Sequence, residues 1–237
     1  MGKDEKIDPK ERILDVAEKI FAESGFEGAS MREIVRAAKV NLATVYYYFE
    51  SKEGLLWAVL DRRFDPFFKE QKEALKKLQE EPDKYTLEDL IVCMLRTPLR
   101  IAESEPSRSQ IIRRLIGRMV TEPHRMTQEA NKRRHKDLRD GFINLIKSKL
   151  PYLDEKDLQW RFEFIWGALF FILCNPQKVE YMSGGLCNPS DTAQVLKQLV
   201  RFCSAGLKAP GVGEDSQNKN SENKKDLNNN NQFKGKL

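Results

Sequence analysis

The chain has 237 residues, 40% of them hydrophobic, with 41 lysines and arginines against 36 aspartates and glutamates, a net charge of +5. Its longest apolar run, residues 164–174, is about half of the ~20 residues that a membrane-spanning helix needs, and its first twenty residues contain no apolar leader, so we expect neither export nor membrane insertion. The four cysteines show no CxxC spacing and are too few for a disulfide scaffold, which favours a reducing cytoplasm.

Four helix starts follow one another within the first 60 residues. The first, at Asp8, is followed by the proline and glutamate that helix N-termini favour, and Gly25 is placed to end that helix. A capping-box pattern predicts a second start at Ser30. The third and fourth helices are expected to begin at Asn41 and Ser51.

Helical periodicity continues through the rest of the chain. Pro66 lies in an apparently helical run, which it either restarts or kinks. Apolar spacing predicts further helices over residues 87–102, 107–120, 127–149, 154–174 and 191–207. No alternating strand pattern is visible, so the predicted fold class is all-α. After residue 207 the chain becomes rich in asparagine and lysine, too polar to offset its ordering entropy by burial, and is expected to be disordered.

The strongest functional signal lies in residues 30–52, which read SMREIVRAAKVNLATVYYYFESK. A helix, a tight turn and a second short helix are the elements of a helix-turn-helix, which inserts the N-terminal half of its second helix into the DNA major groove. The small residues at 43 and 44 let such a helix approach the bases closely, and helix N-termini bind phosphates through their free N–H groups.

This pattern resembles the DNA-binding domain of the TetR family of transcriptional regulators. The resemblance is carried by FAESGF at 21–26, SMREIV at 30–35 and VNLATVYYYFESK at 40–52, and it covers about residues 10–60. The remaining chain is similar to the family in layout, with two C-terminal helices for dimerisation. The resemblance implies three parts: a three-helix DNA-binding domain over residues 1–53, a larger helical effector-binding and dimerisation domain over 54–207, and a disordered tail over 208–237.

The resemblance also implies which residues contact DNA. Those expected at base edges or in the groove are Asn41, Leu42, Ala43, Thr44 and Tyr46. Those expected at phosphates are Ser30, Arg32, Tyr47, Tyr48 and Lys52. Many family members carry serine in place of Asn41 and a polar or basic residue in place of Leu42. Because leucine cannot hydrogen-bond a base, we expect modest direct readout of sequence.

Two C-terminal helices carry apolar faces that suit dimerisation. The residues assigned to the interface are Phe162, Ile165, Trp166, Leu169, Leu196, Leu199 and Val200. Two helices from each of two subunits would form a four-helix bundle, and a two-fold pair of short reading helices suits a palindromic operator. The same periodicity also suits burial inside one chain, so the pattern alone leaves both interpretations open.

The family resemblance implies an effector cavity among the middle helices. The residues assigned to its lining are Leu95, Leu99, Met119, Phe142, Trp166 and Phe170, all of which also suit an ordinary core. Residues 108–149 carry a net charge of +8, which indicates either a solvated basic face or a mouth that attracts an anionic, lipophilic effector through Arg114 and Arg118. Pro66 is the expected hinge between the DNA-binding domain and the effector-binding domain.

The function predicted from these observations is that of a homodimeric repressor which a small effector releases from a palindromic DNA operator. An activator would share the same residues, and a cavity-bearing binding protein without DNA activity is a second alternative. No metal-binding spacing, phosphate loop or nucleophile elbow appears, so no cofactor is expected and an enzyme is disfavoured. Because residues 1–54 carry a net charge of −2, DNA affinity is expected to come from a few placed groups.

Overall fold

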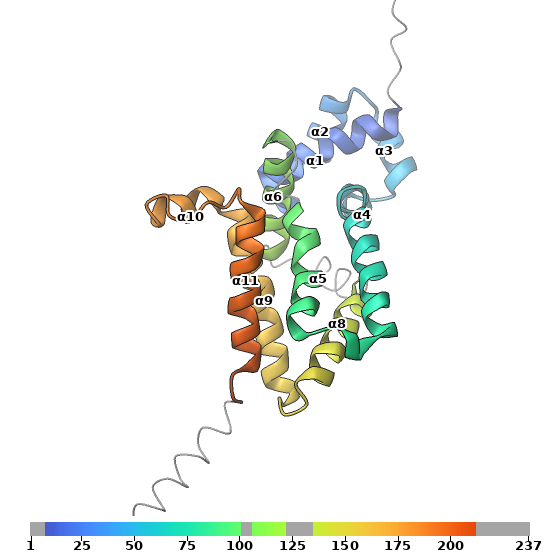
Figure 1. The fold of residues 1–237 in the computed structure, drawn as a ribbon. Helices are drawn as coiled ribbons and strands as arrows, with labels where there is room; N and C mark the ends of the chain where they lie inside the picture. Colours follow the sequence, from blue (N-terminus) through green and yellow to red (C-terminus); the bar gives the residue numbers. More distant parts are fainter. Residues whose placement is uncertain (1–7, 101–105, 122–134, 212–237) are drawn as a thin grey trace, which may run out of the picture.

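The computed structural model describes residues 8–100, 106–121 and 135–211, and within them the regular structure is entirely helical, which confirms the all-α prediction (Figure 1). The helices are α1 (Pro9–Gly28), α2 (Met31–Ala38), α3 (Leu42–Phe49), α4 (Lys52–Glu80), α5 (Leu87–Leu99), α6 (Pro106–Thr121), α8 (Lys136–Lys149), α9 (Glu155–Cys174), α10 (Pro176–Met182) and α11 (Thr192–Lys208), with a 3₁₀ turn at Pro82–Lys84. No helix in these ranges combines the length and the apolar composition that crossing a membrane requires.

The four predicted helix starts at Asp8, Ser30, Asn41 and Ser51 are present, and one of them lacks the predicted side-chain cap. The Asp8 carboxylate accepts from the backbone N–H of Lys10 at 3.0 Å, and the Ser51 hydroxyl accepts from that of Gly54 at 2.9 Å. Ser30 occupies the N-cap position of α2, but its side chain makes no capping hydrogen bond, so the predicted capping box is wrong. Its sequence spacing fits, yet the hydroxyl is exposed and turned to solvent.

Two predicted helix interruptions behave differently. Gly25 adopts a positive φ of 72°, which breaks the regular path of α1 as expected, although three more residues continue in helical form before Ala29. Pro66 lies inside α4, which neither ends nor restarts there, so of the two alternatives that the sequence left open, a restart or a kink, the restart is excluded. Pro66 is exposed, and the carbonyl that loses its amide partner therefore lies on the solvent side of a long helix.

The buried side chains form two clusters. The first joins α1, α2, α3 and the first half of α4 (to Phe64) with Ile112, Leu115 and Ile116 of α6. The second joins the remainder of α4 with α5, α8, α9 and α11. In Figure 1 the head formed by α1–α3 lies at the top, and α4 descends from it along the side opposite α9 and α11. The core around the head thus extends beyond residue 53, where the sequence placed the domain boundary.

Several predicted segments reach into residues outside the described ranges. The helix predicted over 127–149 is present from Lys136, and the one predicted over 87–102 ends at Leu99. Most of the segment predicted to be disordered, from residue 212 onward, lies outside the described residues. Two described elements were not predicted: the 3₁₀ turn and α10, which projects away from α9 and α11 (Figure 1).

Candidate nucleic-acid interface and adjoining cavity

The unit formed by α2 and α3 is held together by a small buried core. Ile34 and Ala38 of α2 pack with Val45 and Phe49 of α3, and all four side chains are buried. The turn between the helices passes through Lys39, which has a positive φ of 51° and ends α2. This core fixes α3 against α2 and leaves the other side of α3 open to solvent.

The open side of α3 carries most of the residues expected to contact DNA. Leu42, Ala43, Tyr46 and Tyr48 are exposed, and Tyr47 retains 81% of its accessible surface. The rings of Tyr47 and Tyr48 lie edge to face, 5.1 Å apart. Several large apolar side chains exposed together on one short helix are typical of a surface that contacts a partner.

Asn41 and Thr44 are tied to each other at the start of α3. The Asn41 side-chain oxygen accepts from both the backbone N–H and the hydroxyl of Thr44, each at 2.7 Å. This cap occupies the Asn41 oxygen, so the amide nitrogen is the group with which Asn41 can reach DNA. The half-buried Thr44 is accordingly a helix-capping partner in the free protein, and a base contact by it stays a prediction.

The basic residues expected at phosphates lie in two environments. Arg32 is exposed near the start of α2. Lys52 is half-buried: its ammonium lies 3.5 Å from the backbone oxygen of Glu27 and 4.6 Å from the centre of the Phe26 ring. Lys52 therefore fastens the start of α4 to the end of α1 in the free protein.

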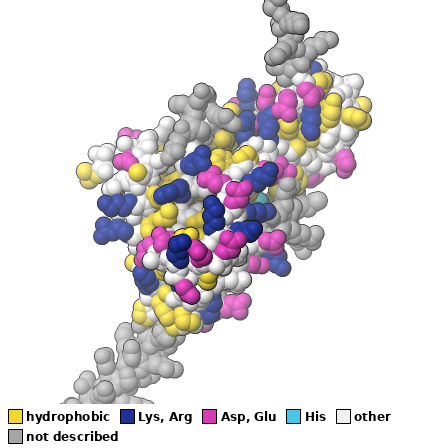
Figure 2. Space-filling model, turned by 45° about the vertical axis from the view of Figure 1, so that its right-hand side comes forward, with side chains coloured by type: hydrophobic (Ala, Val, Ile, Leu, Met, Phe, Trp, Pro, Cys, Tyr) yellow, Lys and Arg dark blue, Asp and Glu magenta, His cyan; other side chains and the backbone are white. Residues whose placement is uncertain are grey.

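Sequence reasoning missed two exposed basic residues of the same unit. Arg36 lies in the last turn of α2, and Lys39 lies in the turn before α3. The signal that could have found them is their position, because basic side chains next to the turn of a helix-turn-helix lie near the DNA backbone. On the face shown in Figure 2, basic and acidic side chains alternate and do not form one continuous basic patch.

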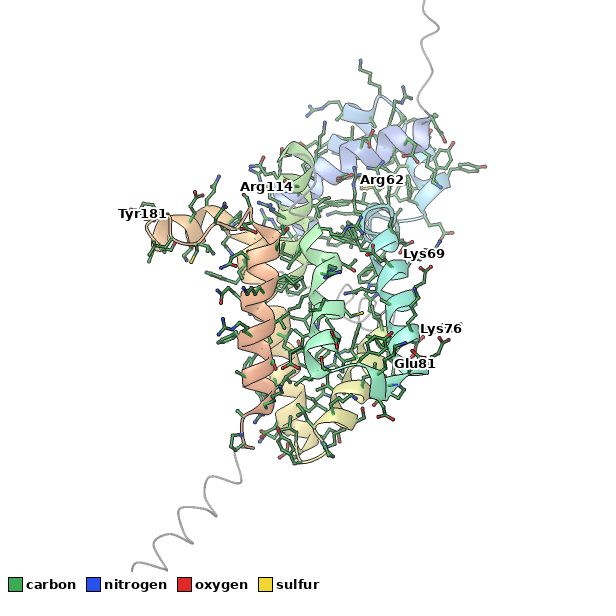
Figure 3. The ribbon with its side chains drawn as sticks, viewed as in Figure 1. Arg62, Lys69, Lys76, Glu81, Arg114 and Tyr181 are labelled. Carbon is green, nitrogen blue, oxygen red and sulfur yellow. The ribbon has the colours of Figure 1, made fainter. Side chains whose placement is uncertain are left out.

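A cluster of charges fastens α1 to α4. Glu18 of α1 is 1% exposed, and its carboxylate accepts hydrogen bonds from Arg62 at 2.6 Å and from Arg63 at 2.6 and 2.7 Å. Arg62 also reaches Glu11 and Asp15, and Figure 3 places it where α4 passes beneath α1. Burial opposes the charge of Arg62, but its hydrogen bonds to Glu18 and Glu11 outweigh burial and raise the pKa of the guanidinium.

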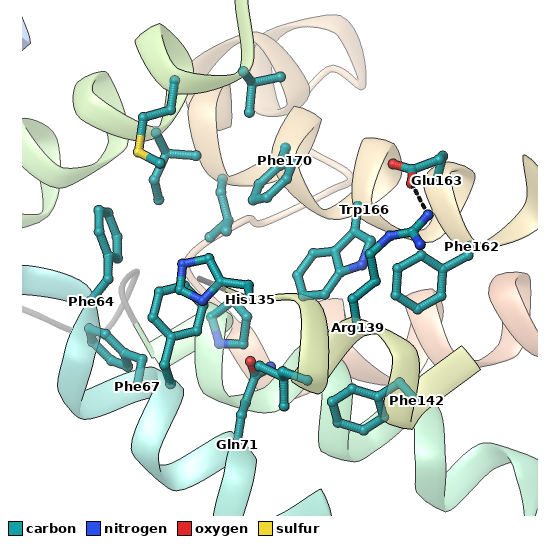
Figure 4. A pocket seen from close by; sticks show the side chains of 17 residues that line it. Phe64, Phe67, Gln71, His135, Arg139, Phe142, Phe162, Glu163, Trp166 and Phe170 are labelled. Atoms are coloured by element: carbon teal, nitrogen blue, oxygen red, sulfur yellow. Dashed lines mark hydrogen bonds and ion pairs between the residues drawn. The ribbon is translucent and has the colours of Figure 1, made fainter. Parts of the chain in front are cut away.

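Below the head, a cavity of about 300 Å³ opens between α4, α6, α8 and α9, and Pro98 of α5 completes its lining. Its lining is rich in aromatic side chains, contributed mainly by α4 and α9 (Figure 4). Four residues that the sequence assigned to an effector cavity lie in this lining: Met119, Phe142, Trp166 and Phe170.

The other four residues assigned to the effector site lie elsewhere. Leu95 and Leu99 are buried in the core around α5 and do not reach the cavity. Arg114 of α6 (labelled in Figure 3) is absent from the lining, and Arg118 donates to the backbone oxygen of Glu23 at 2.8 Å. Neither arginine lies in the described lining, and the hydrogen bond to Glu23 directs Arg118 toward the head, so an anionic effector held by these two arginines stays a prediction.

The residues assigned to dimerisation are mostly interior. Phe162, Ile165, Leu169 and Leu199 are buried within one chain, Leu196 and Val200 are half-buried against the same core, and Trp166 lines the cavity. For the four buried residues the predicted interface is wrong, because they face the core of their own chain; for the three half-buried ones it stays a prediction. The outer side exposes a different set: Trp160, Phe164 and Phe171 on α9, and Phe202 on α11.

Two family models match the chain. The model described as bacterial regulatory proteins, tetR family, matches residues 13–59, and the model described as Tetracyclin repressor-like, C-terminal domain, matches residues 92–206. Together they cover more than half of the chain, including the helix-turn-helix, part of the cavity lining, α9 and most of α11.

The chain is also similar to named regulators. It is 30% identical over 90 residues to the probable HTH-type transcriptional regulator YttP of Bacillus subtilis, which is 38% of this chain and 44% of YttP. It is 35% identical over 82 residues to the HTH-type transcriptional repressor NicS of Pseudomonas putida, which is 35% of this chain and 38% of NicS. The chain therefore spans less than half the length of these curated relatives.

A likeness of fold extends over more of the chain. The structure of SmeT, the repressor of the Stenotrophomonas maltophilia multidrug efflux pump SmeDEF, matches with a TM-score of 0.54 at 20% identity and covers 85% of this chain and 93% of SmeT. At this identity the match concerns the arrangement of helices alone.

Proposed function

The chain belongs to the TetR family of bacterial regulatory proteins, and from this we propose that it is a homodimeric repressor of transcription that a small effector releases from a palindromic DNA operator. The proposal has three parts: a DNA-reading face on α2 and α3, a dimer formed through α9 and α11, and a link between the cavity and the head. Each rests on a different group of side chains.

The DNA-reading face is supported by what α3 leaves uncovered. The exposed residues at its start and middle fit a helix that enters the major groove, and Leu42 suits contact with a thymine methyl group. The exposed hydroxyl of Ser30 and the guanidinium of Arg32 suit contact with phosphates. Because few basic side chains of the head can neutralise phosphates, we expect the affinity for DNA to fall only slowly as the salt concentration rises.

The dimer is supported by the outer sides of α9 and α11. Phe164 and Phe202 retain 62% and 70% of their accessible surface, and a Cβ added at Gly167 or Gly206 would meet no atom. Large exposed aromatic groups beside small residues let two helices of a second copy pack closely. A two-fold dimer would present two α3 helices to successive major grooves, about 34–36 Å apart.

One observation carries the effector link: α4 belongs to both the cavity and the head. Phe64, Phe67 and Phe68 of α4 line the cavity, while the immediately preceding Arg62 and Arg63 hold Glu18 of α1. A molecule that fits the cavity better in one position of α4 shifts the head toward that position, by as much as its affinity differs between the two.

The small-molecule part of the proposal has support from a protein of similar fold. SmeT, described in complex with triclosan, matches this chain with a TM-score of 0.56 at 19% identity. A protein with this arrangement of helices can therefore bind a small aromatic molecule, which supports a small-molecule effector for this chain.

Selection of bound sequences from a pool of random double-stranded DNA tests the proposal directly. We expect the full chain to enrich a palindromic site, and Tyr47→Ala to bind that site about tenfold more weakly through the loss of one contact. Tyr152→Ala, which removes another exposed tyrosine far from α3, is the matched control and should bind as the unchanged protein does. Failure to enrich any site at low salt would leave a ligand-binding protein without DNA activity.

A further inference from the structure

We propose that the cavity binds an uncharged, flat molecule of two aromatic rings that carries one hydrogen-bond donor, and that the side-chain oxygen of Gln71 accepts from this donor. The inference rests on the proposed function in that it takes the cavity as the effector site. It specifies the chemistry of the effector, which the sequence left open.

The shape of the molecule follows from two aromatic walls that face the cavity. Phe64, Phe67 and Phe68 form the wall on α4, and Phe162, Trp166 and Phe170 form the wall on α9 (Figure 4). Aromatic rings pair best when offset-stacked or edge to face, so a flat ring between the walls gains contacts that a flexible chain does not.

The rings of these walls already lie in paired orientations. Phe68 is stacked with His135, with ring centres 3.7 Å apart, and Trp166 is stacked with Phe170 at 5.6 Å. Pairing restricts the motion of each ring before a ligand enters, which lowers the entropy lost on binding. The volume of about 300 Å³ lies at the lower end of ligand pockets and suits two rings better than a larger molecule.

The absence of net charge follows from the polar groups of the lining. Among the described lining residues, the charged side chains are Arg139 and Glu163, which form an ion pair at 3.0 Å. Arg139 also donates to Gln159 and lies over the Phe162 ring, 5.2 Å from its centre. An anionic ligand would lose its hydration among these aromatic side chains, and it would have to replace Glu163 and Gln159 as partners of the guanidinium, so an uncharged ligand is favoured.

The position of the donor follows from Gln71. This residue is buried, and its amide nitrogen donates to the backbone oxygen of Met94 at 2.7 Å. Because that acceptor can only face the nitrogen, the hydrogen bond fixes which end of the amide is the oxygen. Gln71 belongs to the lining and directs its amide toward the cavity (Figure 4), so its oxygen can accept from a hydroxyl or N–H of the ligand.

Calorimetric titration of the full chain with three probes tests the inference. The probes are 2-naphthol, 2-methoxynaphthalene, which has the same rings without a donor, and dodecanoate, a lipophilic anion. We expect 2-naphthol to bind about fivefold to tenfold more tightly than 2-methoxynaphthalene, as one added hydrogen bond predicts, and dodecanoate to bind more weakly than both.

Two variants locate the effect within the cavity. Gln71→Met keeps the length of the side chain and should abolish the preference for 2-naphthol, whereas Trp166→Leu should weaken both naphthalenes and keep the preference. Tyr181→Ala removes an exposed aromatic group outside the cavity and is the control. If Gln71→Met does not fold, the comparison of the two naphthalenes on the unchanged protein still decides the matter.

The outcomes separate this inference from the proposed function. Dodecanoate binding as tightly as 2-naphthol, an equal affinity for the two naphthalenes, or no binding of any probe overturns the inference while operator binding stands. Binding of 2-naphthol with the expected preference, by a protein that selects no DNA site, supports the inference and overturns the proposed repressor function.

Discussion

Replacing Glu18 by glutamine tests how the reading head is fastened to α4. The substitution keeps the size of the side chain but removes its charge and presents an amide N–H₂ group to a guanidinium. Arg62 and Arg63 then lose their shared buried carboxylate. Glu11→Gln is the matched control, because it removes another carboxylate that binds Arg62 but lies on the surface.

The contacts give the size of the expected loss. Glu18 is almost completely buried and accepts three hydrogen bonds from two cations, and breaking a buried ion pair costs about 3–5 kcal/mol. The two guanidiniums keep some exposure, and Arg62 keeps Glu11 and Asp15, so the loss should be near the lower end, about 3 kcal/mol. Loss of the exposed Glu11 pair should cost less than about 1 kcal/mol.

Urea denaturation followed by circular dichroism, at one protein concentration for all variants, measures the free energy of unfolding. Amide hydrogen exchange shows where Glu18→Gln destabilises the protein, and we expect faster exchange mainly in α1 and the first half of α4. Unfolding free energies of Glu18→Gln and Glu11→Gln that agree within about 0.5 kcal/mol would refute the argument that burial makes the Glu18 cluster the main fastening.

Three further predictions concern other parts of the chain. Phe164→Glu places a charge on the outer side of α9 and should give monomers in light scattering, whereas Tyr152→Glu should remain dimeric; a dimeric Phe164→Glu would exclude this interface. Hydrogen bonds from Lys208 and Ser204 lower the pKa of Glu88 from 4.5 to about 2. At pH 6 the free energy of unfolding of the unchanged protein should therefore exceed that of Glu88→Gln by less than about 1 kcal/mol. This difference should disappear as the pH falls toward 2, and a difference that does not change with pH contradicts the assignment. A thiol reagent at pH 7.5 should label exposed Cys187 quickly and the other three cysteines slowly, because burial raises their thiol pKa values, to about 11 for two of them; a second fast thiol contradicts this.

Local sequence signals predicted the helices well because the physics that starts and ends a helix is local. The carboxylate of Asp8 and the hydroxyl of Ser51 each reach a backbone N–H two or three residues away, and such contacts leave a recognisable pattern. The same pattern at Ser30 did not lead to a cap. The pattern at Pro66 could not decide between a restart and a kink, because an exposed proline can be accommodated within a long helix.

The candidate site depends on contacts that leave no such pattern. Arg118 binds the backbone oxygen of Glu23, and every residue type offers that acceptor, so nothing in the sequence distinguishes it. In α9, apolar periodicity located the helix but could not decide which of two apolar sides faces inward; Ile165 is interior and Phe164, its neighbour, is outside. Residues that share a cavity become neighbours only through the packing of several helices, here α4, α5, α6, α8 and α9.

The three side chains of α6 that complete the core of the head limit how this protein can be recombined with others. A chimera cut after residue 53 would leave behind Ile112, Leu115 and Ile116 as well as the core residues of α4 up to Phe64, and would open the buried surface of α1 to water. On the proposed function, moving the operator preference to another sensor would mean exchanging the exposed residues of α3 alone, because the core beneath them continues into α4 and α6.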